Sequence, residues 1–235
     1  TATVTHPGAY RVVAGRDRST CEAFTVRATQ GNRIASSKSE LVWPIERAWS
    51  LPEEALYSAW IRELFHTEPG QQLDYSRLDQ VTSNAERNLM YNALGWGEDS
   101  PDGPNSLYLR PDCADVPYFL RAYWSWKRRL PFAYRACTRG SSTQPPTCRP
   151  PLGNKTRHGR ASQPGELGRF QKFMRRTLAW GVHTGNGRVR LQDAESDFYP
   201  VSISRSSLRP GTIYADPYGH ILVVSEIVDG REGQP

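Results

Sequence analysis

The sequence Arg110-Pro111-Asp112-Cys113-Ala114-Asp115 leads directly into an amphipathic run with helical spacing. Much later in the chain, Gly219-His220-Ile221-Leu222-Val223-Val224 begins an apolar strand with a histidine. A thiol is a poor nucleophile until a nearby imidazole takes its proton. A cysteine at the entrance of a helix and a histidine at the start of a strand therefore predict the two halves of a thiol-nucleophile site.

The predicted helix after Cys113 places the thiol on its entry turn. Its apolar residues repeat at four-residue spacing: Val116, Leu120 and Trp124. Pro117 has to lie in the first turn, because further in it would remove a helix hydrogen bond, so regular helix is expected to begin near Asp115. Unpaired N–H groups at a helix start favour a thiolate and can hold an oxyanion.

Several carboxylates are candidates for orienting the imidazole or lining the cleft. Asp216 lies on the turn before His220 and could fold back onto it. Glu226 shares a strand face with His220, but roughly 20 Å further along the strand. Asp112 and Asp115 flank the thiol, and Asp112 could cap the helix. The sequence leaves the third catalytic member open.

Two other side chains are candidates for the cleft. Tyr118 belongs to an aromatic cluster that we expect to be mostly core, with one or two rings beside the thiol. His183 lies in a glycine-rich segment, for which a solvated loop is the favoured interpretation. The remaining histidines have no partner pattern, and no cysteine pair has CxxC spacing, so we expect neither a metal nor a cofactor.

These motifs resemble the papain-like NlpC/P60 and CHAP amidases, which pair an Asp-Cys helix start with Pro-Gly-Asp and Gly-His-Val strands. The resemblance extends over residues 108–228, and Thr212 stands where the family has its aspartate. It implies an α+β, papain-like fold with a helical N-terminal half and a short antiparallel sheet near the C-terminus. It also implies that Cys113 is the nucleophile, that His220 is the base, and that the substrate is a peptide or a peptidoglycan-like molecule.

Two other functions fit the same motifs. One is a non-catalytic binding or scaffolding domain with the same fold. The other is a transglutaminase-like acyl transferase, whose third residue is usually an aspartate well after the histidine, where this chain has Asp229. The sequence does not choose between hydrolysis and acyl transfer.

The chain divides into a strand-and-loop lead-in over residues 1–48 and a main domain over residues 49–235. Short β-prone runs are expected in the lead-in at 10–13 and 23–28. Besides the helix after Cys113, the patterns predict further elements of the main domain: a helix over 55–65 capped by Ser50, a helix from 83 to 94, a long exposed loop over 135–164, a helix over 166–180, and a hairpin pairing 211–214 with 220–228.

Charge and cysteines limit the partners and the compartment. The net charge is +6, but no nucleic-acid motif is present, so nucleic acid is not expected, and the basic stretch Arg149–Arg176 is interpreted as a solvated surface. A disulfide between Cys137 and Cys148 would close a poorly apolar loop and indicates an oxidising compartment, so we expect a secreted, periplasmic or cell-envelope protein. The state of Cys21 stays open.

No apolar run is long enough to span a membrane. No signal peptide is visible, and the chain begins at Thr1 and ends soon after a strand. We therefore expect an excised or processed piece of a longer protein, with the main domain truncated at its C-terminus. The oligomeric state stays open.

Overall fold

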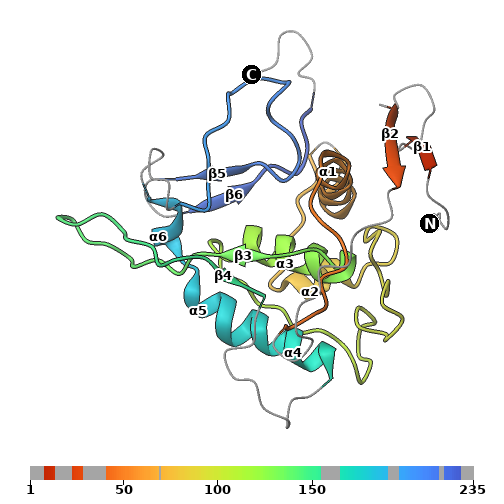
Figure 1. The fold of residues 1–235 in the computed structure, drawn as a ribbon, viewed down its shortest axis with the longest axis horizontal. Helices are drawn as coiled ribbons and strands as arrows, with labels where there is room; N and C mark the ends of the chain where they lie inside the picture. The colour runs from red at the N-terminus through yellow and green to blue at the C-terminus, as the bar shows by residue number, and fades with distance from the viewer. Residues whose placement is uncertain are drawn as a thin grey trace.

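The computed structural model describes residues 41–68, 70–154, 165–189, 196–216 and 220–228, together with the backbone of two N-terminal strands. It is an α+β structure (Figure 1). The elements are β1 (Gly8–Val13), β2 (Ala23–Ala28), α1 (Leu51–Phe65), α2 (Leu78–Thr82), α3 (Val116–Arg128), β3 (Ala133–Tyr134), β4 (Leu152–Gly153), α4 (Glu166–Phe173), a π-helical turn (Met174–Leu178), α5 (Ala179–Gly181), α6 (Thr184–Gly187), β5 (Ile213–Ala215) and β6 (Ile221–Val223). Within the described residues, the strands pair antiparallel as β1–β2, β3–β4 and β5–β6.

Helix α3 is the centre of the core. Ten of its 13 residues are buried, so it meets other elements on nearly every side. It packs on α1 through the stacked rings of Trp60 and Tyr123, whose centroids lie 5.6 Å apart. It packs on α4 through Trp126 and Phe170, whose rings stack at 3.9 Å. Figure 1 shows α3 (green) between the α4–α5 helices and the β5–β6 hairpin.

The ends of α3 follow from its sequence. The helix begins at Val116 with Pro117 in its first turn, as predicted, so Cys113 lies on the entry turn. It ends at Arg128, and the next residue, Arg129, adopts a left-handed conformation with φ 61°, two residues before Pro131. A proline cannot continue the helix, and the residue before a proline is pushed away from helical geometry.

Two other predicted helices are confirmed. In α1, the Ser50 hydroxyl accepts a hydrogen bond from the Glu53 N–H at 3.3 Å, which satisfies one of the free donors of the first turn. The run predicted over 166–180 is helical throughout, with a π-helical turn in its middle. The C-terminal hairpin is also present, although its paired strands are shorter than the sequence predicted.

The helix predicted from 83 to 94 is wrong. The structure has α2 immediately before this segment and a succession of turns within it. Asparagine side chains compete with helical hydrogen bonds here: the Asn84 carboxamide accepts the N–H of Glu86, and the Asn88 carboxamide accepts the N–H of Met90. Asn92 has φ 48°, which ends any right-handed helix at that point.

The N-terminal lead-in is shorter than the sequence suggested. β1 and β2 occur where β-prone runs were predicted and pair from Gly8–Ala28 to Val13–Ala23. Val42 and Trp43, however, are buried in the main core, before the boundary expected at residue 48. The Trp43 indole N–H donates to the Leu130 carbonyl at 2.9 Å, which ties this segment to the end of α3.

The segment predicted as a long loop over 135–164 is partly ordered by pairing. β3 and β4 form a short ladder, and a disulfide joins Cys137 to Cys148 further along the same arm. The Thr138 N–H donates to the Thr147 carbonyl at 2.8 Å beside the disulfide. Residues 155–164 and Cys21 lie outside the described residues.

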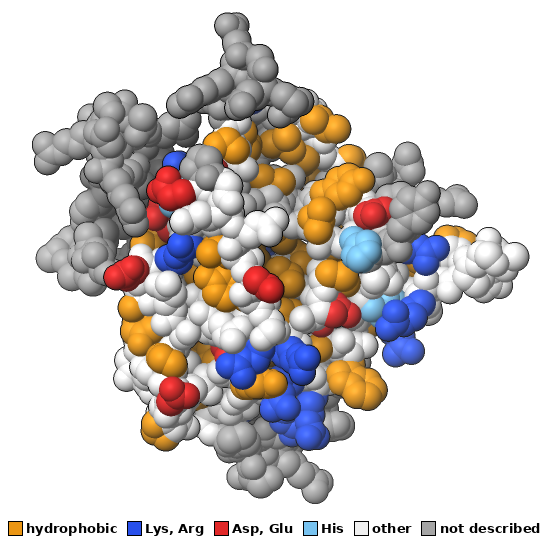
Figure 2. Space-filling model, turned by 180° about the vertical axis from the view of Figure 1, so that it is seen from behind, with side chains coloured by type: hydrophobic (Ala, Val, Ile, Leu, Met, Phe, Trp, Pro, Cys, Tyr) orange, Lys and Arg blue, Asp and Glu red, His pale blue; other side chains and the backbone are white. Residues whose placement is uncertain are grey.

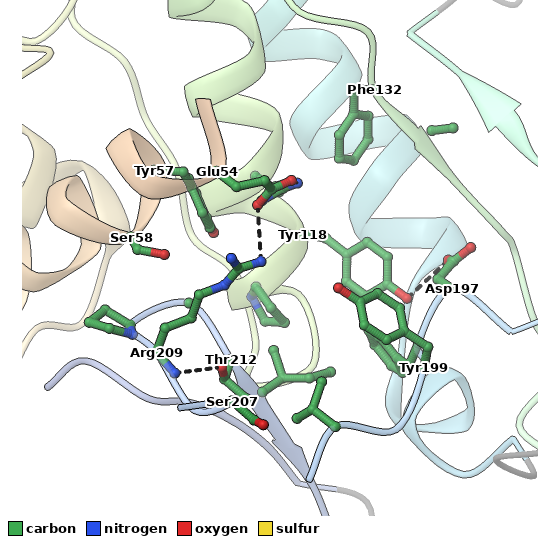
Figure 3. Close-up of a pocket in the computed structure, with 18 residues that line it drawn as sticks. Glu54, Tyr57, Ser58, Tyr118, Phe132, Asp197, Tyr199, Ser207, Arg209 and Thr212 are labelled. Carbon is green, nitrogen blue, oxygen red and sulfur yellow. Dashed lines mark hydrogen bonds and ion pairs between the residues drawn. The ribbon is translucent and has the colours of Figure 1, made fainter. Parts of the chain in front are cut away.

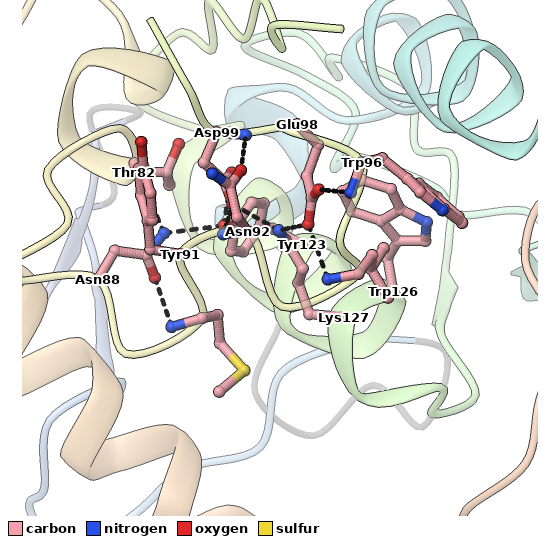
Figure 4. A network of polar contacts seen from close by, with 12 residues as sticks. Thr82, Asn88, Tyr91, Asn92, Trp96, Glu98, Asp99, Tyr123, Trp126 and Lys127 are labelled. Atoms are coloured by element: carbon pink, nitrogen blue, oxygen red, sulfur yellow. Dashed lines mark hydrogen bonds and ion pairs between the residues drawn. The ribbon is translucent and has the colours of Figure 1, made fainter. Parts of the chain in front are cut away.

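A buried ionic cluster fixes the segment between α2 and α3 (Figure 4). The Lys127 ammonium on α3 contacts the carboxylates of Glu98 and Asp99, and all three side chains are fully buried. Asp99 also accepts hydrogen bonds from the Tyr123 hydroxyl and the Asn92 N–H, both at 2.8 Å. Because one ammonium faces two carboxylates, the cluster depends on Lys127.

Lys127→Met should lower the free energy of unfolding by about 3–5 kcal/mol, because it leaves two buried carboxylates without their counter-ion. Urea denaturation measures this change. The matched control is Lys172→Met, since Lys172 is an exposed lysine of α4, and its effect should stay within about 0.5 kcal/mol. Equal small effects in the two variants would contradict the role given to the cluster.

Replacing both Cys137 and Cys148 by Ser should lower the free energy of unfolding by about 2–3 kcal/mol, since the bond closes a loop with a sequence separation of 11. Urea denaturation with and without reductant measures the change. Reductant should destabilise the parent protein and leave the double variant unchanged. A parent protein that is equally stable in both conditions would contradict this prediction.

Candidate active site

The thiol is presented by a tight turn before α3. The Asp112 carbonyl accepts the N–H groups of Asp115 and Val116 at 3.1 and 3.2 Å. The Asp112 carboxylate accepts the N–H groups of Ala114 and Asp115 at 2.9 and 3.0 Å. Asp112 therefore caps the turn before α3 rather than the helix itself, whose N-cap residue is Asp115. The Cys113 side chain in this turn is exposed and free.

The imidazole is presented by the β5–β6 hairpin. His220 directly precedes β6, and its carbonyl accepts the Asp216 N–H at 2.8 Å across the base of the turn. The next residue, Ile221, is buried and contacts α6, where an added Cβ on Gly187 would lie 3.0 Å from the Ile221 Cδ1. β6 packs against α3, so the hairpin carries His220 to the start of that helix.

Cys113 and His220 meet across 107 residues of sequence, with the Cys113 Sγ lying 3.8 Å from the His220 Nδ1. This distance is within the range of a hydrogen bond that involves sulfur, so the ring can take the thiol proton. Both side chains are exposed, which leaves the sulfur accessible to a substrate. Figure 2 shows a molecular face on which histidine side chains reach the surface beside apolar ones.

Glu226 does not lie with His220. Its carboxylate lies 3.0 Å from the His66 Nδ1 and 3.3 Å from the Arg62 Nε, at the C-terminal end of α1. Glu226 thus fastens the segment after β6 to α1 and does not orient His220, in agreement with its separation from His220 along the strand. The pairing also gives His66 a partner that the sequence pattern did not reveal.

Asp115 lies beneath the thiol turn rather than in an open cleft. Its side chain is buried, one oxygen accepts the Asp112 N–H at 3.1 Å, and the other has no hydrogen-bond partner among the described residues. Burial, together with the neighbouring Asp112 charge, raises the pKa of the Asp115 carboxyl to about 7. The Asp112 N–H acts in the opposite direction but is the weaker effect.

Tyr118 belongs to a buried polar chain. Its hydroxyl donates to the Asp197 carboxylate at 3.0 Å and accepts from the Asn186 amide at 3.4 Å. Burial and the Asp197 charge raise the Tyr118 pKa well above its ordinary value, so the phenol stays protonated. Asp197 and Asn186 were not candidates from the sequence, because each is isolated in it and only the fold brings them to α3.

His183 is a structural residue rather than part of a solvated loop. It caps α6, and its Nδ1 accepts the Gly185 N–H at 3.0 Å. Burial lowers the His183 pKa, with Arg139 acting in the same direction. An added Cβ on Gly185 would lie 2.3 Å from the Thr138 carbonyl oxygen, so α6 lies directly against the disulfide arm, and Ile221 packs against the same element.

A cavity of about 340 Å³ opens between α1, the first turns of α3 and the turn-rich segment that leads to β5 (Figure 3). Its polar wall contains Glu54, Arg121 and Arg209, and Tyr118 and Asp197 lie opposite. Gly211 forms part of the wall with φ +92°, and a Cβ there would lie 2.9 Å from the Tyr57 ring. Cys113 and His220 do not line this cavity. However, α3 and the β5–β6 hairpin contribute both to the cavity wall and to the positions of these two residues.

No family model, curated protein or solved structure matches this chain. Within the described residues, no helix is long and apolar enough to cross a bilayer. The same residues contain no group of three or more His, Cys, Asp or Glu side chains that could hold a metal ion. The interpretation of the site therefore depends on its geometry.

Asp115→Asn should flatten the dependence of stability on pH. Between about pH 4 and pH 7 the folded protein keeps a proton on Asp115 that the unfolded chain has released, so the free energy of unfolding falls as the pH rises. The variant should lack this fall, which amounts to as much as about 4 kcal/mol for a shift of about three pKa units. Urea denaturation at several pH values measures it.

The control is Asp74→Asn, since Asp74 is exposed. This variant should follow the parent protein within about 0.5 kcal/mol at every pH. If Asp115→Asn also follows the parent protein, Asp115 is not protonated in the folded state near neutral pH.

Proposed function

We propose that this protein is a cysteine-dependent amide hydrolase with a papain-like fold, in which Cys113 is the nucleophile and His220 the general base. The observation that carries the proposal is the 3.8 Å separation between the Cys113 Sγ and the His220 Nδ1. A free, exposed thiol next to an exposed imidazole has the two groups that covalent amide hydrolysis needs.

The two groups would act in sequence. His220 takes the Cys113 proton, and the sulfur attacks the amide carbonyl carbon to give a tetrahedral oxyanion. As the carbon–nitrogen bond breaks, the imidazolium returns its proton to the leaving amine, and a thioester remains. His220 then takes a proton from water, whose oxygen attacks the thioester and releases the carboxylic acid and the thiol.

The placement of the two residues supports the papain-like assignment. The cysteine lies on the entry turn of the central helix, and the histidine lies at the start of a strand packed against that helix. The mixture of helices with small antiparallel sheets is consistent with this fold. Asp229, which would be compared with the third residue of transglutaminase-like enzymes, lies outside the described residues.

The disulfide indicates the kind of compartment in which this activity would take place. A bond between Cys137 and Cys148 persists in oxidising surroundings, which favours a secreted, periplasmic or cell-envelope protein. Peptides of the cell wall are amide substrates found in such compartments. We therefore extend the proposal to peptides of the peptidoglycan type as substrates.

His220→Ala should slow the alkylation of Cys113 by iodoacetamide at pH 7, because the thiolate is the reactive form and the imidazole promotes it. Labelling is followed by mass spectrometry of the peptide that contains Cys113. The parent thiol should react faster than free cysteine, and the variant should react at about the rate of free cysteine. The control is His66→Ala, since His66 pairs with Glu226 instead, and it should label like the parent protein.

Equal labelling of the parent protein and His220→Ala would contradict the dyad and favour a non-catalytic binding domain. Cys113→Ala should abolish the release of new amino groups from muropeptides while leaving the circular dichroism spectrum unchanged. Incorporation of a labelled amine in place of hydrolysis would instead identify an acyl transferase that uses the same dyad.

A further inference from the structure

At one end of the cavity beside the dyad, the positively charged side chains outnumber the negatively charged ones (Figure 3). Arg121 donates to both oxygens of the Glu54 carboxylate, one of them at 2.8 Å, and its guanidinium lies 3.6 Å from the Trp49 ring centroid. Arg209 approaches the same carboxylate, with its Nη2 3.7 Å from the Glu54 Oε2. Two guanidinium groups therefore share one carboxylate, and this end of the cavity has one positive charge in excess.

Arg209 is the group that remains available to a ligand. Its side chain is 47% exposed, and its distance from Glu54 is too long for a direct hydrogen bond. Its backbone N–H donates to the Thr212 hydroxyl at 3.1 Å, which fixes the start of the side chain at the cavity wall. A carboxylate entering the cavity could take the fork geometry that guanidinium groups bind well.

The other charged side chain that lines the cavity, Asp197, already has hydrogen-bond and ionic partners. The Asp197 carboxylate accepts from the Tyr118 hydroxyl and from the Arg135 N–H at 2.8 Å, and it lies 3.9 Å from the Arg135 Nε. Burial raises the Asp197 pKa, while the Arg135 N–H, the Tyr118 hydroxyl and the Arg135 guanidinium stabilise its charged form. It therefore does not offset the positive end near Arg209.

The rest of the wall is apolar and partly uncovered. Phe132, Phe198 and Ile213 line the cavity, together with Tyr199 and Val201, of which Tyr199 is 74% exposed. The volume of about 340 Å³ suits a small organic group or one large side chain. An apolar body with a carboxylate matches both parts of the wall.

The cavity is also close to the dyad. Pro117, which lines it, follows Cys113 by four residues, so the two Cα atoms lie no more than about 15 Å apart. On the other side, Ile213 lines the cavity and pairs with Val223, shortly after His220. An extended peptide covers such a distance in about four residues.

We propose that this cavity is a binding site for an apolar group that carries a carboxylate, with Arg209 as the residue that recognises the charge. That the carboxylate belongs to the substrate, within about four residues of the cleaved amide, rests on the proposed hydrolase function. The binding of the carboxylate itself does not depend on it.

The test uses two probes that the enzyme cannot cleave, 3-phenylpropanoate and 3-phenylpropan-1-ol, and NMR titration of the purified protein. The parent protein should bind the carboxylate about three- to tenfold more tightly than the alcohol, as expected for one charge-assisted contact at a half-exposed site. In Arg209→Gln the preference should disappear while the affinity for the alcohol stays unchanged. Arg209→Lys should keep part of the preference.

The matched control is Arg176→Gln, since Arg176 is an exposed arginine of the π-helical turn that does not line the cavity, and its preference should equal that of the parent protein. Equal binding of the two probes, no binding of either, or a preference that survives in Arg209→Gln would overturn the site. If Arg209→Gln binds neither probe, the proposal is also overturned, because Arg209 would then maintain the structure of the cavity rather than recognise the charge.

Failure of the binding test leaves the proposed hydrolase intact, because alkylation of Cys113 reports on the dyad alone. Conversely, a carboxylate site together with an unreactive Cys113 would establish a binding protein. The two proposals are therefore separated by two independent measurements.

Discussion

The packing of α3 inside a shell of aromatic rings is the interaction on which the rest of the structure depends. Trp60 and Phe170 stack on the Tyr123 and Trp126 rings of this helix, and the buried Lys127 cluster ties the preceding segment to its last turn. Because α3 is held on nearly every side, its first turn is a fixed platform. Cys113 is exposed at the surface, but the turn that carries it leads directly into this buried helix.

His220 is held by a less regular part of the molecule. Its hairpin has only three paired residues in each strand, so backbone pairing alone gives it little stability. Contacts with α3 and with α6 stabilise the hairpin further, and Gly185 of α6 lies directly against the Thr138 carbonyl of the disulfide arm. The geometry of the dyad thus depends on the disulfide arm as well as on the core.

The carboxylates near the site show how the fold separates residues that look alike in sequence. Asp112 caps the thiol turn, and Asp115 is buried below it with a raised pKa. Glu226 binds at the end of α1, and Asp197 is held by Tyr118 and Arg135. A carboxylate acts according to its burial and its partners, which are set by residues far away in the chain.

Features that depend on neighbours along the chain could be predicted from the sequence alone. Local spacing and capping predicted α1, α3 and the α4 run, as well as the C-terminal hairpin and the position of Cys113 on an entry turn. The prediction from sequence failed over residues 83–94, where asparagine side chains take the backbone hydrogen bonds that a helix needs. Only the tertiary structure decided the 3.8 Å contact between Cys113 and His220, the role of Glu226 and the Arg209 cavity, because these depend on packing between segments separated by many residues.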